Sequence, residues 1–137
     1  MSSFHLQIVS PDGKFYDGDA YQISVRTLEG EVAIRANHIP YVTAIGAGEC
    51  RVYKEQGDDP HRAACIGGFL SVSKDMVLLA ATTFEWAEDI DMDRANKAKE
   101  KAESILSSSS SDLHSVEVAK IKLTRALTRA KVYESRK

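Results

Sequence analysis

Several residue types that organise other classes of protein are scarce in this chain of 137 residues. It has two cysteines, Cys50 and Cys65, at a spacing that fits neither a metal site nor a redox motif, so we predict free, buried thiols in a reducing compartment. No apolar run reaches the ~18 residues that a membrane-spanning helix requires. The first residues lack a basic segment followed by an apolar one, so no secretory signal is expected.

What is present is an ordinary globular composition with an uneven distribution of charge. Residues 1–93 carry 7 basic and 15 acidic side chains, a net charge of −8, whereas residues 94–137 carry 11 and 5, a net charge of +6. A basic tail predicts an acidic partner, which could be nucleic acid, a phosphate ligand, an acidic protein surface or the acidic body of the same chain. Tyr133 is the only aromatic residue of the tail, so it offers no stacking platform for nucleic acid.

The first 87 residues show the two-residue period of β-strands. Apolar and polar side chains alternate over residues 4–9, 21–26 and 50–54, and the continuous apolar run at 76–81 predicts a strand buried on both faces. Turn signals such as Pro11-Asp12-Gly13 and Ser73-Lys74-Asp75 separate these runs, which predicts an antiparallel sandwich or barrel. No helix with a lysine follows Gly67-Gly68, so this pair predicts a bulge or a close backbone approach and not a phosphate loop.

From Asp91 onward the period becomes helical. Asp91 is a suitable N-cap for a first helix that ends in five serines, and Ser111 or Asp112 can cap a second helix. The apolar stripes of the two helices are Ala95, Ala98, Ala102 and Ile105, and then Val116, Ala119, Leu123, Ala126, Ala130 and Tyr133. We predict a helical hairpin. Its alanine seam buries little apolar area, so the hairpin should be marginal and able to dock, undock or open; a static hairpin packed on the body is the alternative.

Two groups of charge stand out around this hairpin. Five acids lie between Glu85 and Asp93, where they suit either a solvated face or the positive end of a helix dipole. Arg125 and Arg129 are one helical turn apart on one face, and together with Arg94 and Lys101 on the other helix they could hold a phosphate chain. Solvated helix charge is the alternative reading of these cations.

Four stretches of the chain resemble, in order, segments of the epsilon subunit of bacterial F-type ATP synthase. They are residues 4–10 (FHLQIVS), 29–40 (EGEVAIRANHIP), 67–72 (GGFLSV) and 90–95 (IDMDRA). The sequence departs from the family pattern at Val32-Ala33, Ala36-Asn37, Tyr41 and Ser71.

This resemblance implies a β-sandwich of about ten strands in residues 1–87 and a helical hairpin in residues 88–137. It implies a non-catalytic rotor subunit of a proton- or sodium-translocating ATP synthase, at the cytoplasmic face of the bacterial membrane. The sandwich would bind the gamma subunit and the c-ring through Ser10, Glu31 and His38. The hairpin would fold against the sandwich or extend toward the alpha and beta subunits, where it inhibits ATP hydrolysis.

The resemblance also implies ATP, with or without Mg²⁺, as a regulatory ligand and not an obligatory cofactor. Ile90 and Asp91 would take the adenine, with Glu85 nearby. Arg94, Arg125 and Arg129 would take the ribose and phosphates, Ala95 would leave room, and Lys101 would add a further positive charge. Two other functions remain open: a free-standing ATP-sensing module, and an enzyme that uses Asp91-Met92-Asp93 to bind a divalent metal.

Overall fold

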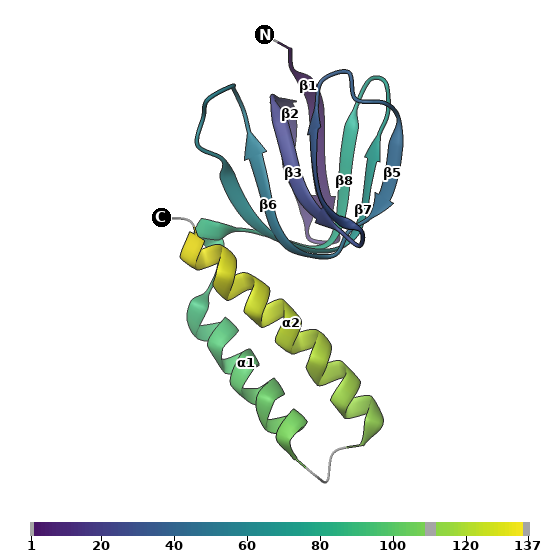
Figure 1. Ribbon diagram of the computed structural model, residues 1–137. Coiled ribbons are helices and arrows are strands. Elements are labelled where there is room, and N and C mark those ends of the chain that lie inside the picture. The colour runs from purple at the N-terminus through teal and green to yellow at the C-terminus, as the bar shows by residue number, and fades with distance from the viewer. Residues whose placement is uncertain (1, 109–111, 136–137) are drawn as a thin grey trace. The chain divides into compact units, whose positions relative to one another are not determined.

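The computed structural model describes residues 2–108 and 112–135. It divides into two compact units, Met1–Trp86 and Ala87–Lys137. The first unit consists of the strands β1 (Phe4–Ser10), β2 (Gly13–Ala20), β3 (Gln22–Thr27), β4 (Gly30–Arg35), β5 (Tyr41–Ala44), β6 (Ala47–Tyr53), β7 (His61–Val72) and β8 (Val77–Trp86) (Figure 1). The second consists of a short 3-10 helix, η1 (Ala87–Asp89), and the helices α1 (Met92–Ser107) and α2 (Leu113–Ser135). No helix in the described parts of the chain is long and apolar enough to cross a membrane.

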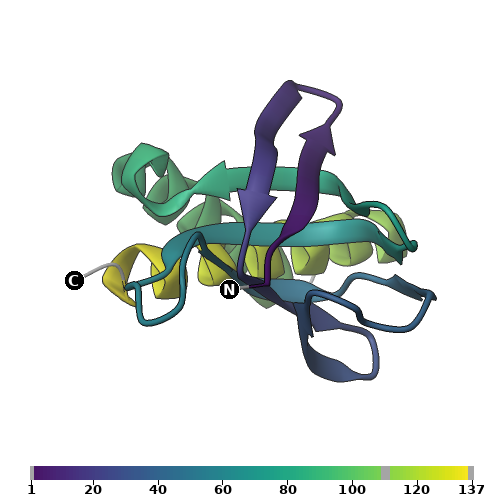
Figure 2. The ribbon, with the colours of Figure 1, turned by 90° about the horizontal axis from the view of Figure 1, so that it is seen from above.

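The strands follow the order β2-β1-β8-β7-β6-β3-β4, and β5 pairs with β7. Viewed from above, β8 and β7 lie between the β1–β2 hairpin and the β3–β4 hairpin (Figure 2). All named strand pairs are antiparallel except β1 and β8, which are parallel. Parallel neighbours need a long connection, and here the strands between β1 and β8 supply it.

Two long strands run through both layers of the sandwich. The first half of β7 pairs with β6, its second half pairs with β5, and almost its whole length pairs with β8. Only the beginning of β8 pairs with β1. The predicted fold class, a β-sandwich followed by a helical hairpin, is confirmed. The structure has eight continuous strands where about ten were predicted, because β7 and β8 each contribute to both layers.

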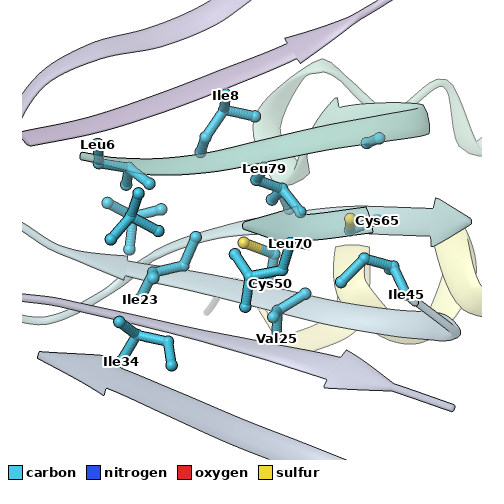
Figure 3. Close-up of a cluster of buried hydrophobic side chains, with 14 of the residues drawn as sticks. Leu6, Ile8, Ile23, Val25, Ile34, Ile45, Cys50, Cys65, Leu70 and Leu79 are labelled. Atoms are coloured by element: carbon cyan, nitrogen blue, oxygen red, sulfur yellow. The ribbon is translucent and has the colours of Figure 1, made fainter. Parts of the chain in front are cut away.

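The core lies between the layers and is built from the alternating positions of the strands (Figure 3). Leu6, Ile8, Ile23, Leu70 and Leu79 are fully buried there. Burying a leucine or isoleucine side chain stabilises a fold by roughly 1.5–3 kcal/mol, so this cluster is the main source of the sandwich's stability.

Both cysteines belong to this core, and the prediction of free, buried thiols is confirmed. Desolvation by burial raises the pKa of Cys65 to about 12. Desolvation is also the main cause that raises the pKa of Cys50 well above its ordinary value. Both groups are therefore uncharged thiols at neutral pH, and they act in the fold as small apolar side chains.

Two local predictions were wrong. The sequence pattern indicates no strand over residues 13–20, yet these form β2, an edge strand whose apolar side chains are too few to show alternation. The apolar run in β8 was predicted to be buried on both faces, but only one face is: Val77, Leu79 and Ala81 are buried, whereas Leu78 and Ala80 are partly exposed.

The predicted close backbone approach at Gly67-Gly68 is confirmed. Gly68 has φ +102° and Gly67 has φ +74°, values that side chains on L-residues rarely allow. A Cβ atom added at Gly68 would lie 2.8 Å from Ala81 Cα and would also collide with the carbonyl oxygen of Ala80 on the neighbouring strand. Glycine therefore allows β7 and β8 to stay paired where β7 passes from one layer to the other.

The second unit contains two helices that pack side by side in opposite directions (Figure 1). Their seam is made of alanines, since Ala95 and Ala102 of α1 and Ala119 and Ala126 of α2 are all buried. The predicted stripes are thus confirmed at their central positions, while the predicted marginal stability of the hairpin stays a prediction. Most of the predicted serine loop, Ser109 to Ser111, lies outside the described residues.

Asp112 is the N-cap of α2, which was one of the two caps that the sequence predicts. Its Oδ1 atom accepts a hydrogen bond from the backbone N–H of Ser115 at 2.7 Å. This hydrogen bond to the charged carboxylate is the main reason why the pKa of Asp112 is lowered. The stability of the first turn of α2 therefore depends on whether the Asp112 side chain is charged.

Acid should therefore weaken the start of α2. A lowered pKa in the folded state means that the carboxylate of Asp112 stabilises the fold fully above the ordinary aspartate pKa of about 3.9. That contribution is lost as the pH falls below this value and through the lowered pKa of the folded state. Circular dichroism at 222 nm between pH 7 and pH 2 measures the effect. In D112N, asparagine can cap the helix but does not titrate, so this variant should lack this part of the acid-induced loss of helix. Identical pH curves for D112N and wild-type protein would contradict the role of the cap.

Candidate functional site

The start of α1 is fixed by the first residues of the predicted nucleotide motif. The Oδ1 atom of Asp91 accepts a hydrogen bond from the backbone N–H of Arg94 at 3.1 Å, and its backbone is extended, which confirms it as the N-cap. Ile90 is buried, and its backbone N–H donates to the carbonyl of Ala87 in η1 at 3.3 Å. Ala95 lies buried one turn further on, in the seam. This end of the hairpin therefore has a defined backbone, with the Arg94 side chain exposed beside it.

The two predicted arginines of α2 lie on one face of that helix, because they are four residues apart. Both are half-buried, and the alanine between them that faces the seam, Ala126, is fully buried. The Nε atom of Arg125 is buried and has no hydrogen-bond partner among the described residues. A buried guanidinium N–H without an acceptor is costly, and it is the kind of group that a bound anion would satisfy.

Further along the hairpin, Lys101 lines a cavity of about 380 Å³ between the two helices. Lys122 of α2 lines the same cavity. Arg94 and Arg129 each lie seven residues from these lysines, a rise of about 10 Å toward the other end of the hairpin. Because the helices are antiparallel, Arg94 and Arg129 both lie toward the end of the hairpin that is opposite to its loop.

The structure thus places seven of the eight predicted nucleotide residues in one unit: Ile90, Asp91, Arg94, Ala95, Lys101, Arg125 and Arg129. The eighth, Glu85, lies in β8 of the other unit, where it pairs with Ala64 of β7. Lys122 was not singled out from the sequence, although its position three residues before Arg125 puts both on one helix face. Among the described residues, no three His, Cys, Asp or Glu side chains are grouped as metal ligands, so the acid pair Asp91 and Asp93 has no third ligand there.

The residues predicted to bind gamma and the c-ring occupy two ends of the sandwich. Ser10 ends β1, and its hydroxyl oxygen accepts a hydrogen bond from the backbone N–H of Asp12 at 3.1 Å. Glu31 is the second residue of β4 and forms an ion pair with Arg51 of β6. His38 follows β4, and it lines a cavity of about 280 Å³ with the first residues of β1. Residues 31–35 of the segment that joins Glu31 to His38 belong to β4.

The strand register shows why these residues do not form one cluster. Tyr41, just after His38, is level with Val72, Val77 and Leu6 through three strand pairs. Ser10 lies four residues beyond Leu6, a distance of roughly 13 Å along the strand. Ser10 and Glu31 therefore lie toward one end of the strands and His38 toward the other.

Comparison with known proteins agrees with this two-part architecture. The family model described as ATP synthase, Delta/Epsilon chain, beta-sandwich domain matches residues 3–87, and the model described as ATP synthase, Delta/Epsilon chain, long alpha-helix domain matches residues 88–134. The class of protein is therefore a two-domain subunit of ATP synthase. The chain belongs to the Delta/Epsilon chain family, and the relatives it matches carry the name ATP synthase epsilon chain.

Two of these relatives and one solved structure illustrate the match. The epsilon chain of Shouchella clausii is 40% identical over 132 residues, which is 96% of each chain. That of Alkalihalophilus pseudofirmus is 44% identical over 112 residues, covering 82% of this chain and 83% of the relative. A chain in the structure of the Euglena gracilis mitochondrial ATP synthase superposes with a TM-score of 0.82 over 96% of this chain and 81% of its own length, at 23% identity, and so supports the fold.

Proposed function

We propose that this chain is the epsilon subunit of a bacterial F-type ATP synthase, which acts as a non-catalytic rotor subunit at the cytoplasmic face of the membrane. The observation that carries this proposal is the match of both family models, in order, over residues 3–87 and 88–134. In this role the chain couples rotation to ATP synthesis, driven by protons or sodium ions, and restrains ATP hydrolysis through its hairpin.

The sandwich is proposed to bind the gamma subunit and the c-ring. The separation of Glu31 and Ser10 from His38 supports contacts at two ends of the strands instead of one, as two partners require. Glu31 is about half exposed despite its ion pair with Arg51, so its carboxylate remains accessible to a partner. The hairpin is proposed to contact the alpha and beta subunits, for which its net positive charge is suited.

The hairpin is also proposed to bind ATP, with or without Mg²⁺, as a regulatory ligand. The unpaired, buried Nε atom of Arg125 supports this proposal, because a phosphate oxygen would satisfy it. Arg129 of α2 and Arg94 of α1 would hold the remaining phosphate charge and the ribose. The buried Ile90 and the fixed backbone at Asp91 would border the adenine, and Glu85 is proposed as a further ligand residue.

The proposed regulation follows from linkage. ATP stabilises the folded hairpin only by binding it more tightly than the open form, and at 100 times its dissociation constant it would add about 2.7 kcal/mol. An alanine seam that contributes only a few kcal/mol could be shifted by an effect of this size. ATP would then keep the hairpin folded and the synthase active, and its loss would release the hairpin toward the alpha and beta subunits.

Two measurements test these proposals separately. Titrating the full chain with ATP up to millimolar concentration, with and without Mg²⁺, should raise its Tm by several degrees. An unchanged Tm would exclude the ATP site. Hydrolysis by the parent complex with and without residues 88–137 tests the restraint: truncation should raise the rate severalfold, and equal rates would exclude an inhibitory hairpin. A chain that never copurifies with a membrane complex would instead be a free-standing ATP sensor.

A further inference from the structure

We propose that Lys122, together with Lys101, binds the terminal phosphate of the nucleotide and makes the hairpin prefer a triphosphate. This inference rests on the proposed ATP site and extends it to a residue on α2 that neither the sequence motifs nor the proposed site includes. Its first support is that both lysines line one cavity of about 380 Å³ between α1 and α2.

Neither lysine is neutralised by a residue that the structure describes. In the described parts of the chain, Lys101 and Lys122 form no ion pair and no side-chain hydrogen bond. Their helical neighbours at three and four residues' distance include no acid: Lys101 has Lys97 on that face, and Lys122 has Arg125. Like charges at these spacings repel and destabilise a helix by a few tenths of a kcal/mol for each pair. The folded hairpin thus concentrates positive charge that a polyvalent anion would relieve.

The arrangement of the cations fits a linear chain of phosphates. Lys101 and Lys122 line one cavity. Arg94 on α1 and Arg129 on α2 each lie about 10 Å further along their helix, and Arg125 lies between Lys122 and Arg129 on α2. A nucleotide with its adenine beside Ile90 and its phosphates beside Arg125 and Arg129 directs its last phosphate toward the lysine pair. A diphosphate is shorter by one unit and gains less from the two lysines.

The walls of the cavity strengthen this preference. Ala98, Ala102 and Ala119 line it, and the two lysines that share this lining are exposed residues, an arrangement in which apolar stems cover apolar surface and ammonium groups reach water. A phosphate at the rim faces these apolar walls on one side and is less fully screened there than in open solvent. Small residues on both helices also leave room for the anion.

The test measures ATP, ADP and inorganic tripolyphosphate binding to the full chain by isothermal titration calorimetry. K122Q should weaken ATP and tripolyphosphate binding by about five- to tenfold, as expected for one partly exposed charge-assisted contact. ADP binding should change by less than about twofold. K120Q is the matched control, since Lys120 lies two residues away on α2, is exposed and does not line the cavity.

The outcomes separate this inference from the proposed function. If wild-type protein binds no ATP, the proposed ATP site fails and the inference fails with it. If wild-type protein binds ATP and K122Q binds it equally well, or loses ATP and ADP affinity to the same extent, only the role of Lys122 is overturned. The helix content of K122Q, measured by circular dichroism, should equal that of the wild type. If K122Q loses helix as well as affinity, the weaker binding reflects misfolding, and the role of Lys122 in binding phosphate is overturned.

Discussion

Replacing Gly68 with alanine should destabilise the sandwich by roughly 3 kcal/mol or more, the largest effect expected from adding a single methyl group to this chain. Two costs add. At φ +102° an L-residue is strained, and its Cβ atom would meet the backbone of Ala80 and Ala81 instead of a side chain that can move away. The clash can be relieved only if β7 and β8 move apart, and both layers depend on the pairing of these two strands.

Chemical denaturation of G68A and wild-type protein measures this difference as a shift in the midpoint. G18A is the matched control, since Gly18 lies in β2 with no left-handed φ and a Cβ atom there would meet nothing within 4 Å. G18A should differ from wild type by less than about 1 kcal/mol. If G68A is as stable as G18A, the point where β7 passes from one layer to the other tolerates a side chain, and the predicted clash is wrong.

Replacing Arg125 with methionine should separate ligand binding from stability. Methionine keeps the apolar stem that packs beside the seam and removes the buried Nε–H that has no acceptor. The ATP-free protein should therefore melt at or slightly above the wild-type temperature. The ATP-induced rise in Tm should largely disappear, because the loss of a charge-assisted contact weakens binding about tenfold or more.

K131M provides the comparison for R125M, because Lys131 is an exposed cation on the same helix and its loss changes the net charge equally. K131M should keep the ATP response. A marked fall in the stability of ATP-free R125M would mean that the arginine has a structural role in the hairpin. An unaltered ATP response in R125M would place the phosphates elsewhere.

Much of the fold could be predicted because its signals are local. The strands β1 and β3, the turn at Ser73-Lys74-Asp75 and the cap at Asp91 each depend on a few neighbouring residues, and the structure confirms them. Burial alternates in β1 but not throughout β3, where Ser24 is buried beside Ile23 and Val25. β2 was missed because an edge strand buries only a few of its side chains. The burial of β8 on only one face depends on which distant elements cover the sheet, and a short stretch of sequence does not carry this information.

The candidate site was predictable in its residue types and not in its arrangement. The spacing of Arg125 and Arg129 predicts one helix face, and the resemblance supplies Arg94 and Asp91. The unpaired Nε atom and the cavity shared by two lysines arise only when α1 and α2 pack. The separation of His38 from Ser10 likewise depends on strand register, because residues close in a motif can lie at opposite ends of a sheet.

The passage of β7 and β8 through both layers has a consequence for how the sandwich comes apart. Their mutual ladder extends from Ala63–Trp86 to Val72–Val77, and β1, β5 and β6 pair directly with one of these two strands, so both layers depend on the same two backbones. Neither sheet can peel away while its counterpart remains intact. In a hydrogen-exchange experiment, the slowly exchanging amides of the two layers should consequently become exposed together, in one global opening with a single free energy.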